Sequence, residues 1–436
     1  MTMAKICKPI VEYKEIILSN GLTIDKYSPT KKTMQRFIRI FKKISDTRVE
    51  QMIDYPLYEI LLIAFMTILA NGSGWSDMEQ FGQEKEKWLK KFLPLKNGIP
   101  SHDTFQRVFS LIDAQELQNA TVQFIVENIG ALKKSLGIKD ENRQICIDGK
   151  EECSTGRKYG TDEKIRNMQM LHVYDASNEI CLFSKAIDEK TNEIPVAQEI
   201  IKILNLKDAV VTFDALHTQT KTIGLIVKQG GNYVGALKEN QCNLATDAAE
   251  CFSDAVKKKI RENENNYYKT LEKAHSQVET REYYLAKAQL CLSDKDNWKK
   301  LKSFICYEKN IYNTITGEET KEIRYYISSL TDIVLCADSI RGHWQIENKL
   351  HWHLDVNFFE DDNTTMNRNA FTNLSILNKM ALSLSKLAQP LMGKSSLRAV
   401  RKRFAWSFES NLGLILSAFD EDAIKQALLS AQNKKR

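Results

Sequence analysis

The stretch AVVTFD, Ala209–Asp214, carries the clearest information about the fold of this chain. Its almost entirely apolar residues, ended by an aspartate, are typical of a short strand that is buried on both faces of a sheet. In α/β proteins, functional groups collect at the carboxyl ends of such strands. Asp214 is therefore predicted to close a central strand and to be a candidate functional residue.

The elements on either side of this strand predict an α/β core. Three strand-like runs and a helix precede it, and a helix and a strand follow it: Ile145–Asp148, Gln169–Tyr174, Ile180–Ala186, Pro195–Leu204, Thr218–Val227 and Tyr233–Leu237. The resulting order, β-β-β-α-β-α-β, is that of an RNase H-like core. In such a core the first and fourth strands lie side by side.

Asp148 is an acidic residue within the first apolar strand and is followed by Gly149 and Lys150. If the first and fourth strands are neighbours, Asp148 and Asp214 meet. Carboxylates held together raise each other's pKa unless a cation lies between them. Sites rich in oxygen ligands suit Mg²⁺ or Mn²⁺, so this pair predicts a metal site.

A third carboxylate comes from IRGHWQIENKLHWHLDVNFFEDD, Ile340–Asp362. On a helix that turns by about 100° per residue, Glu347 falls within an apolar and aromatic stripe. The stripe contains Ile340, His343, Trp344, Leu350, His351 and Leu354. A carboxylate buried there needs a cationic partner or a metal ion, and a salt bridge to Lys or Arg is the simpler alternative. A late helix could lay Glu347 across the two aspartates.

Composition limits the class of protein. The 436 residues are 43% hydrophobic and 27% charged, an ordinary balance for a soluble globular protein. The net charge of +6 permits nucleic-acid binding without requiring it. Nine cysteines without a CxxC pair indicate reduced thiols in a cytoplasmic protein. No signal peptide is recognised, and the longest apolar run, Leu57–Ala70, contains Glu59 and is too short to span a bilayer.

The flanking segments differ from the core in pattern. In residues 46–139, short helices and a Ser101-capped helix carrying Arg107 predict either a helix-turn-helix-like DNA-reading unit or a plain helical bundle. In residues 393–436, Arg401 and Arg403 stand beside aromatic residues, which suits a nucleic-acid surface or a solvated helix. The predicted division is a basic leader (1–45), a helical DNA-binding domain (46–139), the first part of the core (140–240), a strand-rich insertion (241–327), the catalytic helix that completes the core (328–392) and a basic tail (393–436).

Several long motifs resemble one known family. IDGK, DEKTNEIP, VVTFDALHTQ, GGNYVGALKENQ and RGHWQIENKLHWHLDVNFFEDD resemble bacterial insertion-sequence transposases of the DDE class, in the group that includes the H-repeat-associated proteins. The resemblance covers roughly Asp46–Lys386. It implies that Asp148, Asp214 and Glu347 are the catalytic metal ligands, that the helical domain binds DNA, and that a β-rich insertion precedes the catalytic helix.

The chain departs from the wider superfamily around Glu347. Many relatives carry a Tyr-x2-Arg-x3-Glu-x6-Lys signature, and here Ile340, His343 and Leu354 stand at its Tyr, Arg and Lys positions. Other residues would then have to contact the DNA. The candidates are Lys150, His217, Trp298, Arg341, His343, Lys349 and His351, with Arg107, Arg401 and Arg403 outside the core. For His217 a hydrogen-bonded loop position, and for Trp298 a core position, are the alternatives.

The predicted function is transposition in a bacterial cytoplasm, acting at the nucleoid. A homodimer binds the terminal inverted repeats, and a site with two Mg²⁺ ions, for which Mn²⁺ can substitute, hydrolyses the element ends. The exposed 3′-OH then attacks target double-stranded DNA. Two alternatives remain: an RNase H-like nuclease without strand transfer, and a non-catalytic DNA-binding descendant of a transposase.

Overall fold

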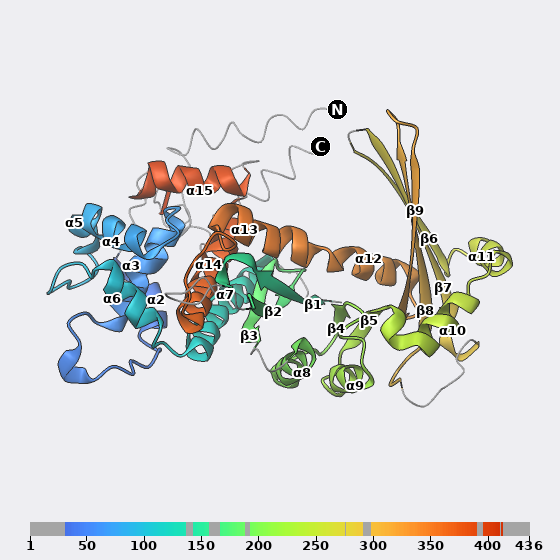
Figure 1. Cartoon of the computed structure of the whole chain (residues 1–436), viewed down its shortest axis with the longest axis horizontal. Coiled ribbons are helices and arrows are strands. Elements are labelled where there is room, and N and C mark those ends of the chain that lie inside the picture. The colour runs from blue at the N-terminus through green and yellow to red at the C-terminus, as the bar shows by residue number, and fades with distance from the viewer. Residues whose placement is uncertain are drawn as a thin grey trace.

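The computed structural model describes residues 31–136, 143–156, 166–187, 192–274, 276–290, 298–389, 396–409 and 411–412. The fold is a mixed α/β architecture in which one nine-stranded sheet carries helices along its length (Figure 1). The strand order is β3-β2-β1-β4-β5-β9-β8-β7-β6. Helices gather at one end of the molecule, and the long strands β6 to β9 form the other end.

The first five strands have the predicted order along the chain. They are β1 (Arg143–Glu152), β2 (Met168–Asp175), β3 (Ile180–Ile187), β4 (Ala209–Phe213) and β5 (Asn232–Leu237). Helix α8 (Glu193–Ile203) joins β3 to β4, and α9 (Thr220–Lys228) joins β4 to β5. β1 pairs antiparallel with β2 and parallel with β4, so the predicted contact between the first and fourth strands is confirmed.

The segment predicted to be a strand-rich insertion continues the same sheet. It supplies β6 (Tyr267–Ala274), β7 (Gln277–Lys287), β8 (Ser303–Asn313) and β9 (Glu319–Ser328), all antiparallel, and β9 pairs with β5. The helices α10 (Cys242–Glu250) and α11 (Asp254–Arg261) precede these strands. Cys251, just after α10, is disulfide-bonded. The expectation of reduced thiols is therefore wrong at this position, whereas six other cysteines among the described residues are free thiols.

The helical end is built from both termini of the described chain. Its helices are α2 (Lys31–Phe41), α3 (Leu57–Leu69), α4 (Trp75–Glu84), α5 (Glu86–Leu89), α6 (His102–Phe109), α7 (Ala114–Leu136), α14 (Arg368–Ala388) and α15 (Leu397–Trp406). The long helix α14 packs against α3, α6 and α7. Asn373 of α14 donates its amide to the carbonyl oxygens of Phe109 and Ile112, which fixes this late helix among the early ones.

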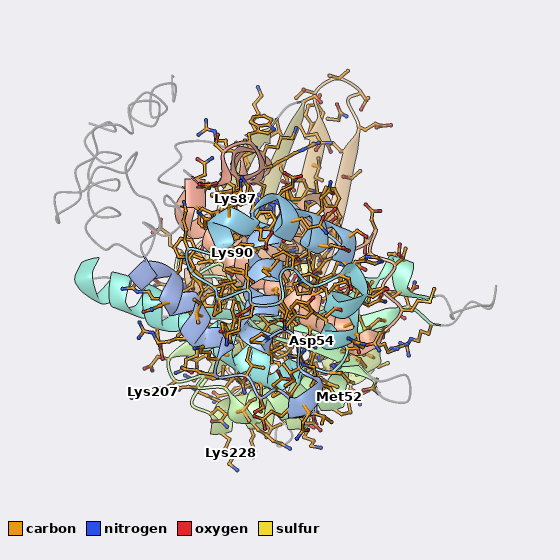
Figure 2. All side chains as sticks on the ribbon, turned by 90° about the vertical axis from the view of Figure 1, so that its left-hand side faces the viewer. Met52, Asp54, Lys87, Lys90, Lys207 and Lys228 are labelled. Carbon is orange, nitrogen blue, oxygen red and sulfur yellow. The ribbon has the colours of Figure 1, made fainter. Side chains whose placement is uncertain are left out.

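Local signals account for several of these helices. The Ser101 side chain accepts a hydrogen bond from the backbone of Thr104, which is the predicted N-cap of α6. One hydrophobic cluster joins the helices to the sheet residues Tyr174 and Cys181. The outer surface at this end carries exposed lysines such as Lys87 and Lys90 (Figure 2). Within the described ranges, no helix combines the length and apolarity that a membrane crossing requires.

Candidate active site

The two predicted aspartates stand on neighbouring parallel strands. Ile147 of β1 is in register with Phe213 at the end of β4, so Asp148 and Asp214 follow at adjacent positions. The backbone N–H of His217 donates to Oδ1 of Asp214 over 3.2 Å and fixes the turn after β4. The sheet pairing thus brings together two carboxylates that are 66 positions apart in the sequence.

Helix α12 (Ile333–His343) is fastened to these two strands by polar contacts. Gln144 donates its amide to the carbonyl oxygen of Ser339 over 2.6 Å, and His343 Nδ1 lies 3.0 Å from the Thr212 hydroxyl. Gly342 is required at this crossing, because a Cβ there would lie 2.0 Å from Oε1 of Gln144. These contacts bring the start of the following helical segment to the Asp148–Asp214 edge.

Glu347 lies in that segment, a π-helical stretch (Ile346–His351) that leads into α13 (Trp352–Phe358). The prediction that its side chain is buried in an apolar stripe is wrong: Glu347 and Trp344 are exposed, whereas Leu350 and Leu354 are buried. The physical reason is the π-helical turn, whose wider hydrogen-bond spacing changes the direction of each side chain from that of an α-helix.

The charges of Asp214 and Glu347 act on the carboxyl group of Asp148. Burial, followed by the negative charges of Asp214 and Glu347, raises the pKa of Asp148 to about 7. Such a shift marks excess negative charge that a cation would relieve. A set of carboxylate oxygens fits Mg²⁺ or Mn²⁺ in donor chemistry. The ligand atoms of Asp148, Asp214 and Glu347 are not all within 4.8 Å of one another. In the described part of the chain, only Glu152, Asp355 and Asp361 bring three such ligand atoms that close.

Glu193 is a fourth acidic group at this edge, to which the sequence reasoning assigned no role. It begins α8 after the N-cap Asn192, and its charge also raises the pKa of Asp148. A Cβ on Gly149 would lie 2.5 Å from its Oε1, so its carboxylate rests on the glycine of the IDGK motif. Its other oxygen is 3.3 Å from Nε2 of His217. The DEKTNEIP motif was the only sequence signal for it.

His351 and His172 flank Asp148 on the helix side. His351 Nδ1 lies 3.9 Å from Oδ2 of Asp148, and its Nε2 lies 3.0 Å from Nδ1 of His172. Burial lowers the pKa of His351 to about 3, and burial also holds the pKa of His172 well below its usual value. Both rings are therefore neutral at pH 7. His172 was not among the predicted site residues, because the sequence shows it only as one residue within a strand.

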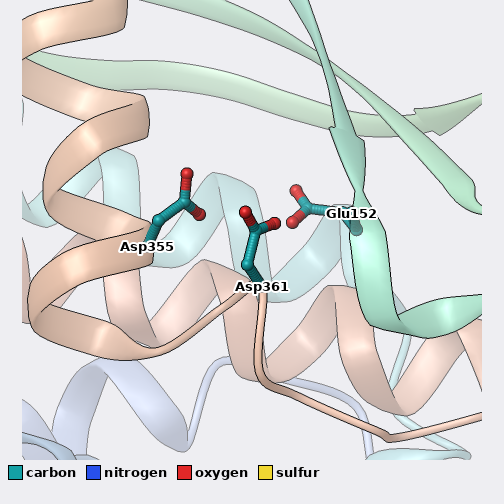
Figure 3. A group of neighbouring side chains, drawn as sticks. All are labelled: Glu152, Asp355 and Asp361. Atoms are coloured by element: carbon teal, nitrogen blue, oxygen red, sulfur yellow. The ribbon is translucent and has the colours of Figure 1, made fainter.

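A second acidic cluster lies further along β1 and contains Glu152, Asp355 and Asp361 (Figure 3). The ammonium of Lys150 is 2.5 Å from Glu152, 2.7 Å from Asp355 and 3.4 Å from Asp361. Burial and the charge of Glu360 raise the pKa of Glu152 to about 7, against the attraction of Lys150. A lysine thus occupies the position that a metal ion would take, and Lys150 is engaged with carboxylates rather than open to DNA.

The other predicted DNA contacts fall into two groups. Arg107, Arg341 and Lys349 are exposed, and the last two pair with Glu272 and Glu179 at 3.0 and 3.4 Å. His217 is buried, and Trp298, His343 and Arg403 are half-buried.

Arg401 is a correction to the predicted DNA contacts. It is only 2% exposed, and its guanidinium lies 3.7 Å from the centre of the Phe358 ring and donates to Asn71. Arg401 cannot contact DNA in this conformation, because it lies on the buried face of α15.

A cavity of about 280 Å³ lies between β7, β8, β9 and α12, and its lining reaches Trp344 and Asn348. Its lining includes the basic residues Arg281, Lys309, Arg324 and Arg341, together with Trp344, which Arg324 covers at 4.9 Å. The basic groups pair with Glu272 of β6, Glu279 of β7 and Glu322 of β9. The wall of this cavity is thus both charged and aromatic.

The chain belongs to the family described as the transposase DDE domain, which matches residues 105–384. A region associated with that domain matches residues 38–125. The family and its H-repeat group, identified from the motifs, are thereby confirmed.

Two relatives from Escherichia coli (strain K12) are named as H repeat-associated transposases. YhhI is 30% identical over 369 residues, which cover 83% of this chain and 93% of YhhI. YbfD is 27% identical over 238 residues, which cover 55% of this chain and 88% of YbfD. Among solved structures, a piggyBac transposase synaptic complex with hairpin DNA aligns over 95% of this chain and 83% of its own, with 12% identity and a TM-score of 0.34.

Proposed function

We propose that this chain is a DNA transposase whose catalytic residues are Asp148, Asp214 and Glu347. The observation that carries the proposal is that these carboxylates come from β1, β4 and the π-helical segment and lie near enough for the charges of Asp214 and Glu347 to act on Asp148. Together with burial, these charges raise the pKa of Asp148 to about 7. Membership of the transposase DDE family supports it. The strand order β3-β2-β1-β4-β5, with β1, β4 and β5 parallel, supports an RNase H-like core.

Asp148, Asp214 and Glu347 would hold two Mg²⁺ ions, for which Mn²⁺ can substitute. Divalent ions at such a site supply neutralisation of the developing phosphate charge and a lower pKa for an attacking water. The two aspartates come from paired strands and are rigidly placed, whereas Glu347 reaches the site from a helix that crosses them. Rigid placement matters because positioning and charge neutralisation account for most of the rate in phosphoryl transfer.

The reaction has two phosphoryl-transfer steps. In the first, water attacks the phosphorus at the element end, a new P–O bond forms, and the bond to the 3′-oxygen breaks to leave a 3′-OH. In the second, that hydroxyl attacks a phosphorus of target DNA, and the displaced 3′-oxygen of the target takes up a proton. The number of phosphodiester bonds is conserved in the second step, so it needs no external energy source.

The DNA would lie across the exposed Glu347 and along the helical end. Arg341 and Lys349 flank Glu347 on the surface, and Arg107 is exposed on α6. In the proposal, residues 46–139 recognise the terminal inverted repeats, and a homodimer holds both ends together in the bacterial cytoplasm, on nucleoid DNA. Binding through phosphate contacts should weaken steeply with added salt, because the contacts release counterions.

The test is Mg²⁺-dependent cleavage and joining on DNA that carries the flanking ends of the gene's own locus. Wild type is compared with Glu347→Gln and with Glu84→Gln, a control at an exposed glutamate of α4. We expect joined products from wild type and the control, and none from Glu347→Gln although it still binds DNA.

Equal joining by Glu347→Gln and wild type would remove Glu347 from the site. Cut ends without joined product would indicate a nuclease. Binding without cleavage in Mg²⁺ or Mn²⁺ would indicate a non-catalytic DNA-binding protein.

A further inference from the structure

Asp148, His351 and His172 contact one another in sequence, in that order. Asp148 of β1 and His172 of β2 are paired across the two antiparallel strands, so their side chains stand on the same face. His351, the last residue of the π-helical segment, lies over this pair. Its ring faces Asp148 at 3.9 Å through Nδ1 and His172 at 3.0 Å through Nε2.

One assignment of protons satisfies this arrangement. A neutral imidazole has one N–H donor and one bare acceptor nitrogen. If His351 carries its proton on Nδ1, it can donate to the Asp148 carboxylate, and its bare Nε2 then accepts from Nδ1–H of His172. The Nε2 of His172 would be the bare nitrogen, and this atom is buried without a hydrogen-bond partner within the described ranges. An unpaired acceptor costs less there than a protonated Nε2, whose N–H would need a partner.

We propose that His351, braced by His172, is a positioning residue that orients the Asp148 carboxylate through its Nδ1–H. This inference rests on the proposed function, because it concerns the carboxylate that would hold the metal ion. The contact of 3.9 Å is longer than a hydrogen bond, and contacts at catalytic sites commonly tighten when the ligand arrives. The arrangement gives His351 a role other than contact with DNA, which agrees with its burial.

The π-helical turn has a purpose in this arrangement. Glu347 and His351 are four residues apart, and in an α-helix they would lie on the same face. Here Glu347 is exposed and His351 is buried against the sheet. A single segment can therefore present one group to DNA and another to Asp148.

The first measurement is the tautomer of each histidine, from ¹⁵N shifts of the full-length protein labelled at its seven histidines. Signals of His351 and His172 are assigned by their loss in His351→Asn and His172→Asn. We expect both rings to carry the proton on Nδ1. A proton on Nε2 of His351 would overturn the inference, and the tautomers are read from the wild-type protein without recourse to its activity.

The second measurement is Mn²⁺ binding followed by electron paramagnetic resonance. The asparagine amide can replace an Nδ1–H donor and the glutamine amide can replace Nε2, so His351→Asn and His351→Gln form a matched pair. Loss of a residue that orients a metal ligand weakens metal binding by about 10- to 100-fold. We expect that loss for His351→Gln, a smaller one for His351→Asn, and none for the control His353→Gln, whose ring contacts Asn357 instead.

The outcomes separate this inference from the proposed function. Binding that Asp148→Asn abolishes and His351→Gln leaves unchanged would overturn the inference alone. Equal losses for His351→Asn and His351→Gln would also overturn it, because the donor at Nδ1 would then not matter. Absence of Mn²⁺ binding by wild type would overturn the proposed metal site and this inference together.

Discussion

Replacing Lys150 by Met tests whether the cluster on β1 is a neutralised charge network. The Lys150 side chain is 7% exposed and lies within ion-pair distance of Glu152, Asp355 and Asp361. Glu152 is fully buried. Removal of the ammonium therefore leaves a buried carboxylate without its nearest cation, the situation in which losing one partner of an ion pair is most costly.

The expected loss in free energy of unfolding is about 3–5 kcal/mol for a buried pair broken in this way. The loss should depend on pH. The pKa of Glu152 is raised to about 7, above its usual value of 4.5. A buried carboxyl with a raised pKa contributes stability below its usual pKa and loses that contribution as the pH rises through the raised value. The variant lacks the compensating ammonium, so its loss should be larger at pH 8 than at pH 5.

The assay is urea unfolding followed by tryptophan fluorescence at both pH values. Lys349→Met is the control, because Lys349 is exposed, its partner Glu179 keeps a second cation in Lys386, and pairs of exposed side chains contribute about 0–1 kcal/mol. The double variant Lys150→Met/Glu152→Met should recover much of the loss, since apolar replacement of a whole buried pair is often neutral. Equal losses for Lys150→Met and Lys349→Met, or no dependence on pH, would refute the reasoning.

Two further predictions concern glycine and arginine positions. Gly149→Ala should displace the Glu193 carboxylate, because the new Cβ would lie 2.5 Å from its Oε1, and this flexible side chain can move away at little cost in stability. Gly224→Ala, with 3.8 Å of clearance in the helix α9, should stabilise the protein by about 0.5–1 kcal/mol in thermal melts. A large loss of stability in Gly149→Ala would contradict this expectation. Arg401→Met should leave DNA affinity unchanged, because the guanidinium of Arg401 is buried. Arg107→Ala should weaken DNA binding and lower the slope of its salt dependence by about one, because Arg107 is exposed. The opposite pattern in a salt titration would contradict both assignments.

The order of the core elements could be predicted because burial determined the pattern of each strand. The bounds of β4 agree with the prediction, since both of its faces are covered and five residues in succession are buried. β1 extends four residues beyond its predicted end at Asp148. Its last residues look polar, and Lys150 and Glu152 are tolerated inside only because Asp355 and Asp361, about two hundred positions away, lie beside them. No local pattern contains that information.

The strand β6 has only a weak signal in the sequence, for a different reason. Its sequence, YYKTLEKA, mixes charged and apolar residues, and Leu271 on it is 66% exposed. β6 lies at the edge of the nine-stranded sheet and is paired on one side only, with β7. An edge strand needs no clean alternation of buried and exposed residues, so the periodicity that identifies central strands is weak here.

The predicted burial of Glu347 depended on a helical wheel, and the structure departs from that wheel at this residue. The wheel assumed an α-helix throughout and therefore buried Glu347 together with Leu350 and Leu354. In the structure the π-helical turn keeps Leu350 and Leu354 in the core and leaves Glu347 exposed. Under the proposed function Glu347 contacts DNA, and a regular α-helix that buries Leu350 and Leu354 would turn Glu347 toward the same core face. The departure from regular helix geometry extends over Ile346–His351, and local sequence rules are expected to break most often at functional sites.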